Sequence, residues 1–169
     1  MSTVAARFPP VLVGALILHQ AVLPDLRLFG VAAEVLLLVA IAAGLAAGPD
    51  RGAVTGFVTG LVADLFMHTP FGLSALVYSL TGYAVGRFAG TILRSTRWIP
   101  VMTAAVASAG GIVAFAAAGS VLDQGHVVSG PLVTVVAVVA LLNGLLSLLV
   151  IPATRWALAG DEPRVLAGR

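Results

Sequence analysis

A single carboxylate stands in one of the most apolar parts of this chain, at a regular spacing from small residues. Asp64 follows Gly60 by four residues and Gly56 by eight, in the run GFVTGLVAD. An acid that faces hydrocarbon costs about 2.5–3.5 kcal/mol on insertion scales, so such residues usually face the protein interior or water. Two chemistries are open to Asp64: it could accept hydrogen bonds from the free N–H groups that open the next helix, near Gly72, or it could carry protons or cations.

Other ionisable residues decide between these two chemistries. Transport of protons or cations normally needs several ionisable partners within the membrane, and only Glu34 and Arg87 are candidates. We therefore interpret Asp64 as a structural link between two helices or as a contact to a partner protein. Glu34 opens an apolar segment, where it caps a helix, is solvated or meets a partner. Arg87 is expected to extend its guanidinium to the inner membrane surface.

The remaining reactive side chains do not form a catalytic or metal-binding pattern. The run GLSA at residues 72–75 matches the glycine-x-serine spacing of intramembrane serine proteases, which need a histidine on another helix to activate the serine. Ser74 is expected at the start of a helix and His126 in an outer loop, so no such pair is predicted. His19 and His68 lack the spacing of paired ligands, and the chain has no cysteine. We expect no enzyme activity, no cofactor and no metal site.

Composition identifies the elements that must position these residues. Of 169 residues, 60% are apolar and 9% are charged, and the mean hydropathy is +1.10. Soluble domains have roughly 45–50% apolar and about 25% charged residues. The sequence predicts an all-α, polytopic membrane protein: one six-transmembrane-helix domain over residues 1–151 and a short tail over 152–169. The third segment, at about 24 Å, is shorter than the ~30 Å hydrocarbon core, so it needs a thinned bilayer or longer neighbours that shield it. The apolar segments are approximately 9–23, 31–48, 53–68, 72–93, 99–121 and 131–151.

The arginines set the orientation, because basic residues accumulate in short loops on the cytoplasmic side. All nine basic residues are arginine. With the N-terminus inside, Arg27 alone lies outside, and an even number of spans returns the C-terminus to the cytoplasm. The net charge of +2 reflects this topology and not affinity for nucleic acid. The arginines on the inside are Arg7, Arg51, Arg94, Arg97, Arg155, Arg164 and Arg169, with Arg87 near the inner end of the fourth segment.

Two sets of glycines recur every four residues in the third and fourth segments. Residues four apart share a helix face, and small residues there let the backbones of membrane helices approach closely. The two segments are joined by a tight loop and must be antiparallel. Two facing glycine stripes would make a close hairpin; alternatively, each stripe packs on another helix. The glycines are Gly52, Gly56 and Gly60 in the third segment and Gly82, Gly86 and Gly90 in the fourth.

The stretch from Ala33 to Gly90 resembles the rod shape-determining protein MreD family of bacteria. An acid opens an apolar helix, a basic turn follows, a glycine-spaced helix ends in Asp-Leu, and a Pro-x-Gly-Leu turn leads to a helix with Gly-Tyr near its middle. The family commonly begins its second helix with Pro-Asp-Leu, whereas this chain has Ala33-Glu34-Val35. The matching parts are Glu34-Val35-Leu36-Leu37, Asp50-Arg51-Gly52, Gly56 to Leu65, Pro70-Phe71-Gly72-Leu73 and Gly82-Tyr83.

The resemblance implies a non-enzymatic scaffold in the bacterial plasma membrane. It would belong to the cell-elongation machinery (the elongasome), which carries out peptidoglycan synthesis and sets cell shape. Its partners would be the membrane protein MreC and, with it, a RodA-type glycosyltransferase, a penicillin-binding transpeptidase, cytoplasmic MreB filaments and membrane lipid. The candidate residues for partner binding or helix packing are Glu34, Gly52, Gly56, Gly60, Asp64, Gly72, Gly82 and Gly86.

A second interpretation is the substrate-binding S component of a vitamin transporter of the energy-coupling-factor type. Such subunits are similar in size and also have six spans with the N-terminus inside. They need an enclosed cavity, open to the outside and lined by aromatic and polar groups. This chain has only two Trp and two Tyr, so the scaffold is the preferred interpretation.

Overall fold

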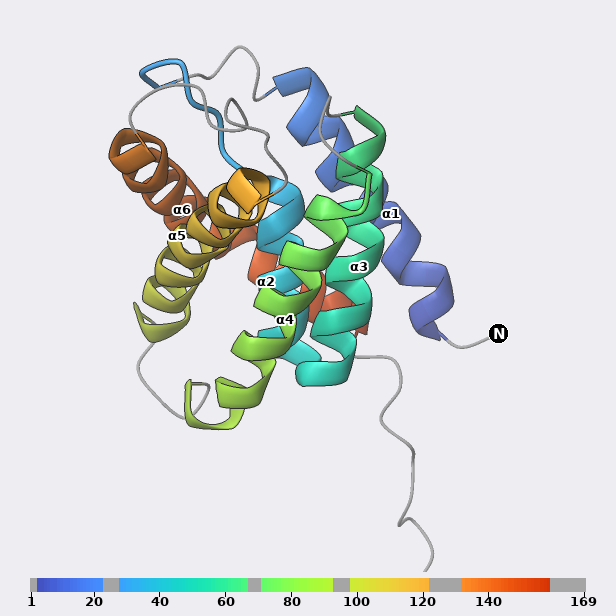
Figure 1. Ribbon diagram of the computed structural model, residues 1–169. Helices are drawn as coiled ribbons and strands as arrows, with labels where there is room; N and C mark the ends of the chain where they lie inside the picture. Colours follow the sequence, from blue (N-terminus) through green and yellow to red (C-terminus); the bar gives the residue numbers. More distant parts are fainter. Residues whose placement is uncertain (1–2, 23–27, 67–70, 93–97, 122–131, 159–169) are drawn as a thin grey trace, which may run out of the picture.

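The protein is an α-helical bundle in the computed structural model, which describes residues 3–22, 28–66, 71–92, 98–121 and 132–158 (Figure 1). One isolated β-bridge joins Leu28 and Val31, and these ranges contain no strand. The all-α prediction is therefore confirmed. The helices are α1 (Thr3–Ile17), which continues into a π-helical turn η1 (Leu18–Val22), then α2 (Val35–Ala47), α3 (Pro49–Phe66), α4 (Leu73–Ile92), α5 (Trp98–Val121) and α6 (Leu132–Leu158).

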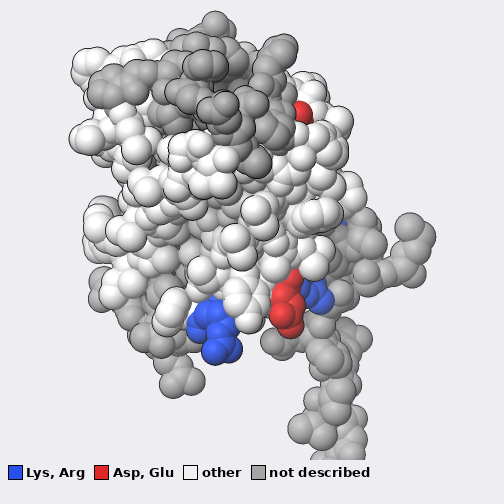
Figure 2. All heavy atoms as spheres, in the orientation of Figure 1, with Lys and Arg blue, Asp and Glu red and all other residues white. Residues whose placement is uncertain are grey.

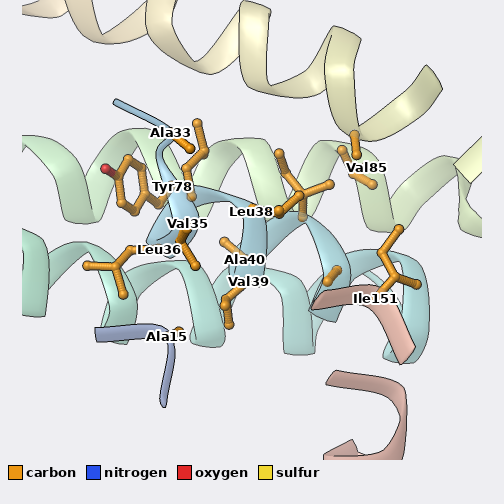
Figure 3. Close-up of a cluster of buried hydrophobic side chains, with 14 of the residues drawn as sticks. Ala15, Ala33, Val35, Leu36, Leu38, Val39, Ala40, Tyr78, Val85 and Ile151 are labelled. Atoms are coloured by element: carbon orange, nitrogen blue, oxygen red, sulfur yellow. The ribbon is translucent and has the colours of Figure 1, made fainter. Parts of the chain in front are cut away.

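Helix α2 forms the centre of the bundle. Every residue from Val35 to Leu45 is buried, and the other five helices all contact α2. Figure 3 shows its side chains pointing in all directions toward the neighbouring helices, among them Leu38 toward Val85 of α4. A helix that is apolar on every face lies either in a protein core or against lipid. Helix α2 takes the first of these positions, since the other helices cover it.

The shortest described α-helix of the bundle is α2, whereas the sequence predicted a short third segment. Helix α2 has 13 residues, or about 20 Å, whereas α3 has 18, or about 27 Å. Helix α2 is short mainly because it begins at Val35, four residues after the start of the expected segment, whereas its end at Ala47 is within one residue of the expectation. Gly48 closes the helix with φ +86° and donates its N–H to the carbonyl of Gly44. Pro49 then opens α3, at the position where a missing N–H costs no helical hydrogen bond. Shielding by longer neighbours, which was expected for α3, applies to α2.

Helix α6 extends seven residues beyond the expected end at 151. It continues through Pro152 to Leu158, so the first part of the expected tail is helical. A contact with α1 helps to hold this last part in place, since the guanidinium of Arg7 lies 5.1 Å from the centroid of the Trp156 ring. Residues 159–169 lie outside the described part. Pro100 falls in the first turn of α5, where proline is tolerated.

Within the described residues, two helices, α5 and α6, are long and apolar enough to cross a membrane, judged on length and composition. Large apolar side chains are exposed on both, including Val106 and Leu149 at 72% each. In Figure 2 the described charged atoms gather mainly at the lower end of the molecule, beneath a broad uncharged surface. Such a surface marks contact with lipid or with another protein.

Candidate functional site

Helices α3 and α4 form a closely packed antiparallel pair that presents the candidate residues. A Cβ atom added to any of the three α3 glycines would collide with the backbone of α4. The α3 stripe therefore faces α4, which is the arrangement of the hairpin interpretation. Close backbone approach of this kind is what small residues allow in membrane helices. The facing pairs are Gly52 with Gly82, Gly56 with Tyr78 and Gly60 with Ala75.

The α4 stripe is shared among several neighbours and does not serve α3 alone. A Cβ at Gly82 would meet the carbonyl of Gly52 and also, at 3.1 Å, that of Ala40 in α2. Gly86 packs on the turn between α2 and α3, against Pro49. Gly44 of α2 joins the same junction through the Gly82 carbonyl. Gly44 was not among the predicted packing residues, although it lies four residues before the glycine that ends α2, the same spacing as in the two stripes. The packing of the last glycine of the stripe, at position 90, lies outside the described contacts.

Asp64 links the end of α3 to the start of α4. Its Oδ2 accepts hydrogen bonds from the N–H groups of Gly72 at 2.8 Å and Ala75 at 3.4 Å, and its Oδ1 accepts one from Ser74 at 3.1 Å. The side chain is 4% exposed. A carboxylate at a helix N-terminus satisfies free N–H groups and interacts favourably with the helix dipole. Both oxygens of Asp64 are therefore used by the chain itself, as the structural interpretation expected.

Gly72 has a different part in this link from that of the packing glycines. Its φ of +98° lies in the left-handed region, which favours glycine, and an added Cβ would meet no atom within 4 Å. The residue allows the sharp turn that brings the first N–H groups of α4 onto Asp64.

The main chain of Glu34 is held by the side chain of Asn143 from α6. The Glu34 N–H donates to Asn143 Oδ1 at 3.1 Å, and Asn143 Nδ2 donates back to the Glu34 carbonyl at 3.1 Å. Asn143 Nδ2 also donates to Ser108 Oγ of α5 at 2.9 Å. Asn143 and Ser108 are fully buried. One amide thus ties the start of α2 to both C-terminal helices.

The side chain of Glu34 does not cap its own helix, so the capping interpretation is wrong. Its Oε1 instead accepts a hydrogen bond from the Tyr78 hydroxyl of α4 at 2.7 Å, and His19 Nε2 of η1 lies 3.8 Å away. His19 Nδ1 is buried and has no hydrogen-bond partner among the described residues. The carboxylate turns away from the helix N-terminus because the buried phenol offers a short hydrogen bond.

Sequence reasoning missed this cluster for two reasons. Asn143 is a lone amide in an apolar run, the same signal that drew attention to Asp64, but it was not considered. Tyr78 and His19 come from other helical elements than Glu34, so neither stands near this acid in the sequence. Ser74 is completely buried, and His68 and His126 lie outside the described residues.

An open groove of about 570 Å³ lies between α4 and α5. It is lined mainly by apolar side chains. The hydroxyls of Thr81 and Thr103 both donate to carbonyls of their own helices, at 2.8 and 2.9 Å. A vitamin needs several polar groups that converge on it, and these two hydroxyls are already used.

Comparison with known proteins gives one result. The family model MreD, described as rod shape-determining protein MreD, matches residues 8–154. The chain shows no match to a curated protein or to a solved structure.

Proposed function

The chain belongs to the rod shape-determining protein MreD family, and from this membership we propose that it is a non-enzymatic membrane scaffold of the bacterial elongasome. Membership implies a role in rod-shape determination in the membrane. The proposal adds the partners: an MreC-like membrane protein and, with it, a RodA-type glycosyltransferase and its penicillin-binding transpeptidase.

The proposed architecture is a single domain that crosses the plasma membrane six times, with both termini in the cytoplasm. The six described helices, of which α5 and α6 are long and apolar enough to cross a membrane, and the placement of the arginines support it. Helix α2, too short to span ~30 Å of hydrocarbon by itself, is covered by its neighbours and needs no contact with lipid. The charged side chains used inside the bundle, Glu34 and Asp64, belong to its outer end in this orientation.

The observation that carries the scaffold proposal is that these polar side chains are engaged within the chain. Asp64 binds the start of α4, Glu34 binds Tyr78, and Asn143 binds the main chain of Glu34. Such bonds fix the relative positions of helices and leave the carboxylates of Asp64, which is buried, and Glu34, which is partly buried, bound to internal donors. A framework held in this way suits a protein that works by presenting a surface to partners.

Co-purification with an MreC-like partner tests the proposal. Gly60→Leu forces α3 and α4 apart, and Asp64→Ala removes the hydrogen bonds that link them. We expect each variant to reduce the recovered complex several-fold. Gly14→Leu is the matched control, because Gly14 is exposed on α1 and has no atom within 4 Å of an added Cβ. Recovery of wild-type amounts of complex from both variants, at equal amounts of protein in the membrane, would contradict the proposal.

A further inference from the structure

The groove between α4 and α5 has a shape and a chemistry that the scaffold role does not use. Small residues, Ala84, Ala107 and Gly110, open its floor, and an added Cβ at Gly110 would meet no atom within 4 Å. Its rim consists of exposed apolar side chains. Those named in the lining of the groove are Leu80, Phe88, Met102 and Val106.

The groove offers no polar recognition along its length. Its two hydroxyls, those of Thr81 and Thr103, bond their own backbones. A polar occupant would therefore lose hydrogen bonds with water that these side chains do not replace. A hydrocarbon chain makes no hydrogen bonds with water and therefore loses none when it enters the groove.

A basic and an aromatic residue stand at one end of the groove. Arg87 is exposed and lies three residues after Ala84 and seven after Leu80, so all three share a face of α4. No carboxylate among the described residues forms an ion pair with Arg87. Trp98, which is 67% exposed, opens α5 at the same end. Tryptophan side chains concentrate at the level of lipid headgroups.

We propose that this groove binds a phospholipid with an anionic headgroup, its acyl chain along the groove and its phosphate at Arg87. At roughly 30 Å³ for each water-sized group, a volume of about 570 Å³ holds roughly one chain of 16–18 carbons. The inference rests on the proposed orientation, which places Arg87 at the cytoplasmic leaflet, where anionic lipids gather. In Figure 2 basic atoms lie at the lower end of the bundle, below the uncharged surface.

Native mass spectrometry of the full-length protein in mild detergent tests the site, with phosphatidylglycerol and phosphatidylcholine as probes. We expect tighter binding of phosphatidylglycerol, by about five-fold, which corresponds to the ~1 kcal/mol of one basic residue near an anionic surface. Arg87→Gln should remove this preference, and Gly110→Leu should weaken the binding of both lipids. Arg155→Gln and Gly14→Leu are the matched controls, since both positions are exposed outside the groove.

Two outcomes would overturn the lipid site. The first is equal binding of both lipids by the wild type, unchanged in Arg87→Gln and Gly110→Leu. The second is that Gly110→Leu leaves lipid binding unchanged but abolishes recovery of the MreC-like partner, which would assign the groove to a protein helix. Because the lipid measurement uses the purified chain alone, a failure to bind the partner would not affect it.

Discussion

Replacement of Asp64 by alanine would test the most specific contact in the molecule. The change removes the acceptor of three N–H groups, of which those of Ser74 and Ala75 are buried. A buried donor left without a partner costs about 1–3 kcal/mol, and loss of an N-terminal capping side chain alone costs about 0.5–2 kcal/mol. Since one of the three bonds is long, we expect Asp64→Ala to lower the free energy of unfolding by about 3 kcal/mol.

The assay is reversible unfolding of the purified protein in mild detergent, followed by circular dichroism. Asp64→Asn keeps one acceptor oxygen, so it should lose about half as much stability as Asp64→Ala. Asp50→Ala is the control, because Asp50 is exposed in the first turn of α3 and its interaction with the helix dipole amounts to about 0.3–1 kcal/mol. An alanine variant within about 0.5 kcal/mol of wild type, or an asparagine variant less stable than the alanine one, would refute the reasoning.

Three further predictions concern the other contacts, each measured by the same unfolding assay. Gly60→Ala should destabilise the protein by about 1–3 kcal/mol through overpacking, whereas Gly14→Ala should be neutral or slightly stabilising; equal effects would contradict the close approach of α3 and α4. Tyr78→Phe should cost about 1–3 kcal/mol because the Glu34 carboxylate loses its short hydrogen bond, and Glu34→Gln in the same background should restore part of the loss. Asn143→Leu should cost about 2–3 kcal/mol, and a stability equal to wild type would show that this amide does not hold the start of α2.

The pairing of α3 with α4 could be predicted because its determinants are local. A four-residue repeat of glycines, an acid on the same face and a short connection are all visible within residues 52–86. The link made by Asp64 spans only eight to eleven residues along the chain. Periodicity and helix-end chemistry are sufficient at that range.

The polar cluster at Glu34 could not be predicted in the same way. Its hydrogen bonds join residues 44 and 109 positions apart, and periodicity along one helix does not say which helices meet. The acid was visible, and a local cap was one of three interpretations considered for it, beside solvation and contact with a partner. The hydrogen bond from the Tyr78 hydroxyl draws the carboxylate of Glu34 away from a capping position. The central position of α2 could not be predicted either, because a uniformly apolar helix can lie in a protein core or face lipid. Its end near Gly48 was predicted, whereas its start at Val35 was placed four residues too early.

The enclosure of α2 has a consequence for the way the protein is made. This helix leaves the ribosome second, yet α5 and α6, which cover one of its flanks, and Asn143, which holds its first residue, are synthesised last. Until α6 is synthesised, the Glu34 N–H lacks the acceptor that it has in the folded protein. The core around α2 is therefore completed only late in translation, and a chain interrupted after α4 would leave α2 partly uncovered.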